Sequence, residues 1–424
     1  MHRAPLAVAL ALLVPAAGCD YVTSSFETND FSGDAFPTTV ETASGALVVG
    51  VQIAGLPGAR TAVIDVLSPI SVVDRGPDVA PSIDSADVTL LGARPPTGSL
   101  DLPRARFPAK QVVTLHPCDA PAGCSVGTPS APRAFDVLIG QNMFTGDALR
   151  LHLATDQIFI LPDIAGSEIH RSRSCDAVLP SPFRGGGTLI IGGTEVGFGN
   201  LRVAIDSCLA PNPDPLATQN ARGVDALLVM STAIGVSMFS ESLYARYRLL
   251  DPTAPELAAL PESDVLLPSG VIRGRLASIP SIALVGNSSS NPRAPCRQMW
   301  ASHLLAERDC RLGDDCPCDG ATFCLVPAIV ELAPAAQLPV LVVADSEPTL
   351  QALRTELRPD RPEVDGILGT SALGDVELDI DYTHDRLLAR CTDRTTCGAR
   401  AVLSDRQNRS FVNGCLGSMP GPIQ

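Results

Sequence analysis

Apolar and polar positions alternate in short runs along most of the chain. Residues 45–55 (GALVVGVQIAG) and 59–74 (ARTAVIDVLSPISVVD) are rich in β-branched residues, and a Leu-Pro-Gly turn separates them. Two such runs around a short Gly/Pro turn predict a β-hairpin. Residues 134–162 close the first half with further strand-like runs. The pattern therefore predicts many short strands and turns rather than long helices.

The closing segment of the first half recurs in the second half. Residues 135–161 and 364–389 share an acid, an apolar pair followed by glycine, a short helix-like step, and two strands around an acidic turn. The two glycines are Gly140 and Gly369. A repeat at this spacing indicates a duplicated domain, because solenoid units are only about 20–50 residues long.

The rest of the second half is expected to follow the first. Residues 187–193 repeat the start of the hairpin at Gly45, and residues 224–247 repeat residues 60–74. At 424 residues the chain is long enough for two domains. The expected segments are a signal peptide (1–18), a lipidated flexible tether (19–43), an N-terminal lobe (44–165), a C-terminal lobe (185–395) with a Cys-rich insertion (296–324), and a C-terminal tail (396–424).

The first 19 residues have the order of an export signal. Arg3 precedes an apolar stretch from Leu6 to Val14, and small residues lead to Cys19. The stretch is shorter than the roughly 20 residues that span a bilayer. A cysteine directly after small residues resembles the lipobox of bacterial lipoproteins, which implies cleavage before Cys19 and lipid on its sulfur. We therefore expect a protein of the cell envelope, held at a membrane by acyl chains such as palmitate. Ordinary secretion with a coincidental cysteine is the alternative.

The cysteine count agrees with export. Of 13 cysteines, 12 remain without Cys19, an even number compatible with disulfides. The near neighbours Cys118 with Cys124 and Cys391 with Cys397 are candidate pairs. The other candidates are Cys175, Cys208, Cys296, Cys310, Cys316, Cys318, Cys324 and Cys415. Cys316 and Cys318 are separated by one residue, whereas the cysteines of zinc sites are usually separated by two to four. No histidine lies among these cysteines, so we expect neither metal nor cofactor.

The charge of the chain narrows the range of partners. The net charge is -15 and the pI is near 4.8. Nucleic-acid binding requires clustered cations against phosphates, so an acidic chain is not expected to bind nucleic acid. The six histidines are scattered without metal-ligand spacing.

The order of the predicted elements resembles that of the aspartic peptidases, in both pepsin-like and retroviral-like forms. In that family each lobe supplies one Asp-Thr/Ser-Gly turn, and a later apolar-apolar-Gly strand braces it. The resemblance covers residues 45–390. It implies a mainly β fold of two pepsin/retropepsin-like lobes, related by a pseudo-two-fold duplication, with few short helices.

The family's chemistry requires two carboxylates about 3 Å apart that share one proton. Asp65 lies where the first lobe has its aspartate, but Val66 and Leu67 replace Thr/Ser-Gly. In residues 228–233 of the second lobe, the partner position is assigned to Met230. Because a thioether cannot transfer protons, Asp65 is predicted to be a catalytic remnant.

Three hypotheses follow. The first is a non-catalytic, membrane-anchored pseudo-peptidase with a binding or envelope role, whose inter-lobe cleft holds an extended peptide or an envelope protein. The second is an active aspartic endopeptidase that uses Asp65 with an unrecognised carboxylate or by dimerisation. The third is a different all-β lipoprotein. The duplicated fold requires Asp65 and Met230 to face each other, with Gly140 and Gly369 beside them.

Overall fold

The computed structural model describes most of the two expected lobes. The described residues are 30–31, 36–40, 44–92, 104–116, 118, 124–162, 177–180, 182–191, 193–199, 202–210, 223–268, 270–286, 296, 305–309, 323–327, 329–332, 337–357, 363–393 and 396–399. The expected signal peptide, the lipid-attachment Cys19, and Cys175, Cys310, Cys316, Cys318 and Cys415 lie outside these ranges. Among the described residues, no helix has the length and apolar character needed to cross a membrane.

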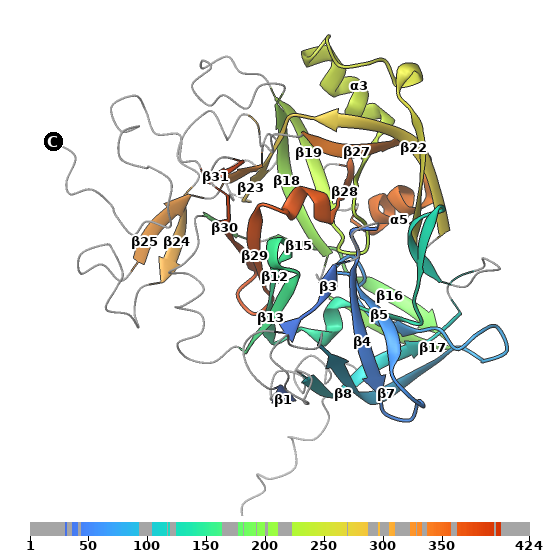
Figure 1. The fold of residues 1–424 in the computed structure, drawn as a ribbon. Coiled ribbons are helices and arrows are strands. Elements are labelled where there is room, and N and C mark those ends of the chain that lie inside the picture. Colours follow the sequence, from blue (N-terminus) through green and yellow to red (C-terminus); the bar gives the residue numbers. More distant parts are fainter. Residues whose placement is uncertain are drawn as a thin grey trace, which may run out of the picture.

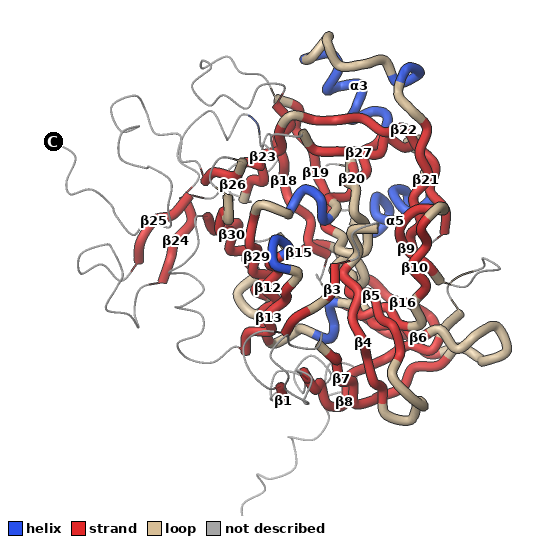
Figure 2. Tube along the Cα trace, in the orientation of Figure 1, coloured by secondary structure: helices blue, strands red, loops and turns tan. Residues whose placement is uncertain are grey.

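The structure is mainly β, as the sequence predicts, and strands dominate both halves (Figure 2). One sheet of eight strands belongs to the first half. It contains β1 (Asp30–Phe31), β3 (Thr39–Val40), β4 (Leu47–Ile53), β5 (Arg60–Ile64), β6 (Ser71–Val73), β7 (Ser82–Leu91), β8 (Arg104–Thr114) and β11 (Val137–Ile139).

The largest sheet has thirteen strands and belongs mostly to the second half. It contains β9 (Ser125–Thr128), β10 (Ala131–Ala134), β15 (Phe183–Arg184), β18 (Arg202–Ala210), β19 (Val224–Met230), β20 (Ser237–Ser240), β21 (Glu262–Leu267), β22 (Gly270–Ile279), β23 (Ser281–Val285), β26 (Ile329–Leu332), β27 (Leu338–Val343), β28 (Gly366–Leu368) and β31 (Cys397–Ala399). The hairpin β9–β10 comes from the first half, so this sheet crosses between the halves.

A six-stranded sheet joins the two halves. It contains β2 (Phe36–Pro37), β12 (Asp147–His152), β13 (Gln157–Pro162), β14 (Ala177–Pro180), β29 (Val376–Asp381) and β30 (Arg386–Cys391). Its centre is the antiparallel pair β12–β29, one strand from each half, and Figure 1 shows them side by side. Leu149, Leu151, Leu378 and Ile380 of these strands are buried in the main apolar cluster.

Two strand pairs stand apart from the large sheets, and the helices are short. The pairs are β16 (Gly187–Ile191) with β17 (Thr194–Phe198), and β24 (Leu305–Asp309) with β25 (Phe323–Pro327), which contains Cys324. Helices whose full bounds lie among the described residues are α3 (Glu241–Leu250), α5 (Pro348–Glu356) and the 3-10 turns η2 (Gln141–Met143), η3 (Leu153–Thr155), η4 (Leu257–Ala259) and η5 (Thr370–Leu373). Helix α3 begins after Ser240, whose hydroxyl accepts the Leu243 amide hydrogen bond.

The same three-strand unit occurs in each half, which is the duplication that the sequence predicts. In the first half β11 lies between β5, which it pairs in parallel, and β6, which it pairs antiparallel. In the second half β28 lies between β19 and β20 with the same directions. The apolar-apolar-Gly strand therefore braces the end of an earlier strand twice in the chain.

Two details differ from the sequence-based expectation. Residues 187–193 do not repeat the strand that follows Gly45, because β16 pairs only with β17 in the described structure, whereas β18 pairs with β19 as β4 pairs with β5. The expected tether also contains strands: β1, β2 and β3 pair with β8, β13 and β4. The edges of β8, β13 and β4 supply the backbone hydrogen-bond partners, so this segment forms strands although its sequence lacks an apolar period.

Candidate active site

Asp65 stands at the end of β5, where the first half has its braced turn. Its backbone N–H donates to the Ile139 carbonyl at 2.9 Å, which continues the pairing of β5 with β11. Its side-chain Oδ1 accepts from the Leu67 N–H at 2.9 Å, a bond that closes the turn. The side chain is buried, with 4% of the residue exposed. Asp65 is thus a buried acid in a turn.

The equivalent residue in the second half is Ser231. Its backbone N–H donates to the Leu368 carbonyl at 3.0 Å, as Asp65 does to Ile139. Its Oγ accepts from the Ala233 N–H at 3.2 Å, as Asp65 Oδ1 does from Leu67. The two residues meet, because Ser231 Oγ donates to Asp65 Oδ1 at 2.9 Å. The partner of Asp65 is therefore a hydroxyl group.

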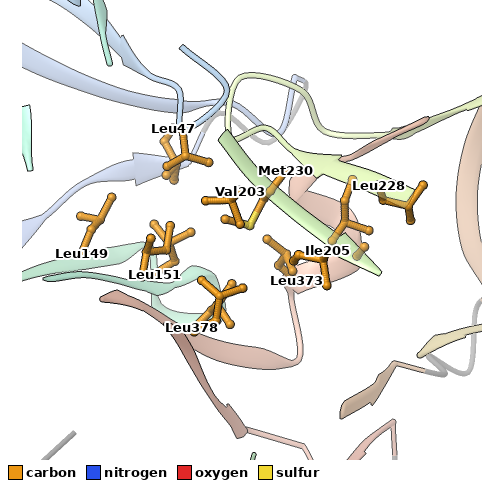
Figure 3. Close-up of a cluster of buried hydrophobic side chains, with 14 of the residues drawn as sticks. Leu47, Leu149, Leu151, Val203, Ile205, Leu228, Met230, Leu373 and Leu378 are labelled. Atoms are coloured by element: carbon orange, nitrogen blue, oxygen red, sulfur yellow. The ribbon is translucent and has the colours of Figure 1, made fainter. Parts of the chain in front are cut away.

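The assignment of Met230 to the partner position is wrong by one residue. Met230 is the last residue of β19, pairs with Leu368 and is fully buried. Figure 3 shows its side chain beside Val203 within the main apolar cluster. It corresponds to Ile64 of the first half, the last residue of β5. Its thioether contributes to the core and does not face Asp65.

Thr232 ties the two turns together. Its Oγ1 donates to the Ile64 carbonyl at 2.7 Å and accepts from the Val66 N–H at 3.1 Å, and its own N–H donates to Asp65 Oδ1 at 3.1 Å. Val66 occupies the matching position in the first turn, but it has no hydroxyl that could form the equivalent hydrogen bonds with the second turn. The side-chain hydrogen bonds of this position therefore run only from Thr232 to the first half.

Gly140 and Gly369 lie beside the two turns, as the sequence predicts. The N–H of Gly140 donates to Ser71 Oγ and that of Gly369 to Ser237 Oγ, both at 3.0 Å. A Cβ on Gly140 would come within 2.5 Å of the Ile70 carbonyl group. A Cβ on Gly369 would likewise come within 2.7 Å of backbone. Glycine is required at both positions because the bracing strand passes so close to the preceding loop.

The electrostatics of the site follow from burial. Burial raises the pKa of Asp65, and hydrogen bonds from the Leu67 N–H, the Ser231 hydroxyl and the Thr232 N–H oppose that rise. All three bonds end on Oδ1. Among the described residues, no second carboxylate forms a hydrogen bond with Asp65. The site can hold one acid and one hydroxyl, and it has no pair of acids that could share a proton.

Leu67 fills space next to Asp65. Its side chain packs against a buried apolar cluster of the second half. The cluster contains Ala204, Leu227, Val229, Ile234, Met238, Val265, Leu267, Ile272, Leu341, Val343, Leu350, Leu353, Leu357, Val364 and Ile367. A glycine at this position would leave that space open. The Leu67 side chain therefore fills the space between the first turn and the second half.

The sequence contains a signal for Ser231 that the Met230 alignment missed. Ser231, Thr232 and Ala233 follow the apolar strand directly, and Thr232 with Ala233 matches the Thr/Ser-Gly part of the family's turn in size and hydroxyl group. The first position of the turn is then Ser231. Met230, the last apolar residue of the strand, lies one position before the turn begins.

Three disulfides occur among the described residues. Cys118 bonds Cys124 and Cys391 bonds Cys397, the two near-neighbour pairs that the sequence suggests. The third joins Cys208 to Cys296 across 88 residues, a pairing that the sequence could not choose among many alternatives.

Comparisons with known proteins give matches in structure only. No family model matches the sequence, and no curated protein is similar to it. An aspartic proteinase from Irpex lacteus has 12% identity and a TM-score of 0.39, over 87% of this chain and 100% of that one. Basic 7S globulin from soybean has 11% identity and a TM-score of 0.40, over 85% of this chain and 95% of that one. The class is defined by the strand connections themselves: a mainly β protein of two halves that share the same three-strand unit. Within that class, this chain joins Asp65 to Ser231 where the two turns meet.

Proposed function

We propose that this protein is an exported, lipid-anchored member of the cell envelope whose pepsin-like body binds an extended peptide or an envelope protein without cleaving it. The observation that carries the absence of cleavage is the Ser231 hydroxyl on Asp65 Oδ1, in the place of a second acid, and the export and the anchor rest on the sequence of residues 1–19. A serine does not ionise at acid pH, so it cannot share a proton with Asp65 or act as the acid partner.

Two further observations support a non-catalytic body. Leu67 packs against the second half beside Asp65, and Asp65 is almost fully buried. Homodimerisation through Asp65 is disfavoured because Ser231 of the same chain already occupies the partner position. A bilobal β body offers strand edges to an extended peptide, whose backbone can pair with them regardless of its side chains.

The test of catalysis uses the purified mature chain and a broad peptide library at about pH 3–7. We expect no cleavage above that of the Asp65→Asn variant. Cleavage that Asp65→Asn abolishes would overturn the proposal and establish an aspartic endopeptidase. The double variant Ser231→Asp/Leu67→Gly supplies the missing acid and opens the turn, and we expect it to gain acid-pH cleavage that Asp65→Asn removes.

The anchoring and the partner have separate tests. Intact-mass analysis of the membrane-extracted protein should show an N-terminal cysteine at position 19 that carries acyl chains, and Cys19→Ala should release the protein from the membrane fraction. An unmodified chain in the soluble fraction would refute the anchor. Pull-downs from envelope extracts with the mature domain should recover a peptide or protein partner, and their failure would refute the binding role.

A further inference from the structure

A second cluster of reactive side chains lies at the contact of the two halves. Asp74 follows β6, His116 follows β8, and Cys118 and Cys124 precede β9. The Asp74 carboxylate and the two sulfurs lie within 4.8 Å of one another. The cluster uses no residue of the Asp65 site, and the proposed function assigns it no role.

The Asp74 carboxylate is held with one oxygen toward the sulfurs. Its Oδ1 accepts from the Gly76 N–H at 2.8 Å and lies 2.9 Å from His116 Nδ1. Its Oδ2 lies 3.4 Å from Cys124 Sγ. Outer hydrogen bonds of this kind are how proteins orient metal-binding carboxylates.

Both sulfurs face oxygen atoms that only accept hydrogen bonds. Cys124 Sγ faces Asp74 Oδ2, and Cys118 Sγ lies 3.4 Å from the Pro268 carbonyl oxygen. A disulfide sulfur has no hydrogen to donate, whereas a thiol donates weakly to such an acceptor. A cation between the thiolates and the carboxylate would also satisfy Asp74 Oδ2. The surroundings thus complement the dithiol or a metal thiolate better than they complement the disulfide.

We propose that the Cys118–Cys124 pair is reducible and that its reduced form binds a thiophilic divalent cation of the Zn²⁺ class, with Asp74 Oδ2 as third ligand. An external dithiol supplies two electrons and two protons, becomes a disulfide itself, and opens the Cys118–Cys124 bond to two thiols. The cation then displaces both thiol protons and binds two thiolates and one carboxylate. Two protons leave for each cation bound.

The distances fit such a site after a small movement. Zn–S bonds of about 2.3 Å in a tetrahedron place two sulfurs about 3.8 Å apart, so the two Sγ atoms need to separate by about 2 Å on reduction. The Cα atoms of Cys118 and Cys124 are 5.1 Å apart, and rotation of the side chains provides this separation. Asp74 Oδ2 already lies at a suitable distance from Cys124 Sγ. A water molecule would complete the tetrahedron.

The location gives this chemistry a structural consequence. Cys118 and Cys124 pack with Val126 and Phe135 of the β9–β10 region and with Ala233 of the Ser231 turn. Strand β9 in turn pairs with β21 of the second half. A change of the two sulfurs from disulfide to thiols or to metal ligands therefore affects the packing of β9, the strand that pairs with the second half.

The test measures protection of individual cysteines in the full chain. The protein is reduced with a phosphine, which becomes a phosphine oxide, and is then alkylated with or without Zn²⁺ and mapped by mass spectrometry. We expect Zn²⁺ to slow alkylation of Cys118 and Cys124 at least about tenfold. The matched control is Cys391–Cys397, with the same separation of 6 residues, whose alkylation should not respond. Circular dichroism establishes that the reduced chain keeps its strands.

Two substitutions separate this site from general thiol binding. Asp74→Asn removes the third ligand, and His116→Gln removes its orienting group, so both should weaken Zn²⁺ protection by about 10–100-fold while circular dichroism stays unchanged. The proposal is overturned if Zn²⁺ gives Cys118 and Cys124 no protection in a reduced chain that keeps its strands by circular dichroism, or if Asp74→Asn protects as well as the wild type. It is also overturned if this disulfide stays closed under conditions that open Cys391–Cys397.

Discussion

Replacing Thr232 with valine should weaken the junction of the two halves strongly, with almost no change in side-chain volume. The hydroxyl makes two bonds, to the Ile64 carbonyl and from the Val66 N–H, in a fully buried position. Without it both backbone groups lose a partner. A buried group that loses its hydrogen bond costs about 1–3 kcal/mol, so the two together cost about 2–6 kcal/mol. Globular proteins have only about 5–15 kcal/mol of stability in total.

The assay is urea unfolding followed by circular dichroism, with Thr61→Val as the matched control. Thr61 lies on β5, is half-buried, and its hydroxyl makes no hydrogen bond in the described structure. The control should change the free energy of unfolding by less than about 0.5 kcal/mol. Equal stabilities of Thr232→Val and Thr61→Val would show that the inter-half bond contributes nothing, and the reasoning would be refuted.

Three further substitutions test other parts of the fold. Burial raises the pKa of Asp65, so the native state holds a proton that the unfolded chain releases. The free energy of unfolding of the wild type, measured relative to that of Asp65→Asn, should therefore fall by about 1.4 kcal/mol per pH unit as pH rises from the usual Asp pKa to the raised one. A difference between the two proteins that does not change with pH in urea titrations would contradict this. Gly140→Ala, whose Cβ meets backbone at 2.5 Å, should lower the melting temperature, whereas Gly199→Ala, which meets nothing, should not; equal melting would contradict the bracing role. Replacing Cys208 and Cys296 with alanine opens an 88-residue loop and should cost about 4–5 kcal/mol in urea unfolding, and a loss under about 1 kcal/mol would count against it.

The glycines of the two bracing strands could be predicted because their requirement is local. Each follows an apolar pair and precedes a short helical step, and both halves repeat this order. Gly140 and Gly369 therefore lie beside the two turns, as expected. Repetition within one chain supplied information that a single copy of so short a motif does not contain.

The partner of Asp65 could not be read in the same way because it depends on register between distant strands. The apolar run of β19 continues through Met230, so hydrophobicity alone does not mark which residue leaves the sheet, and the one local sign is that Thr232 and Ala233 match the Thr/Ser-Gly part of the turn. The bonds that identify Ser231 join residues 166 positions apart. A one-residue shift of register moves a side chain from the core to the turn, and the hydrogen bonds between the two halves identify the residue that takes the partner position.

The pairing of β12 with β29 has a consequence for how the molecule comes into being. Each half contributes one strand to the seam, so either half synthesised alone would present a row of unmatched amides and carbonyls. The amino-terminal portion emerges first and must wait for more than 200 residues of chain before its edge is covered. Until then, that unfinished edge is the place where a chaperone, or a neighbouring copy, would attach first.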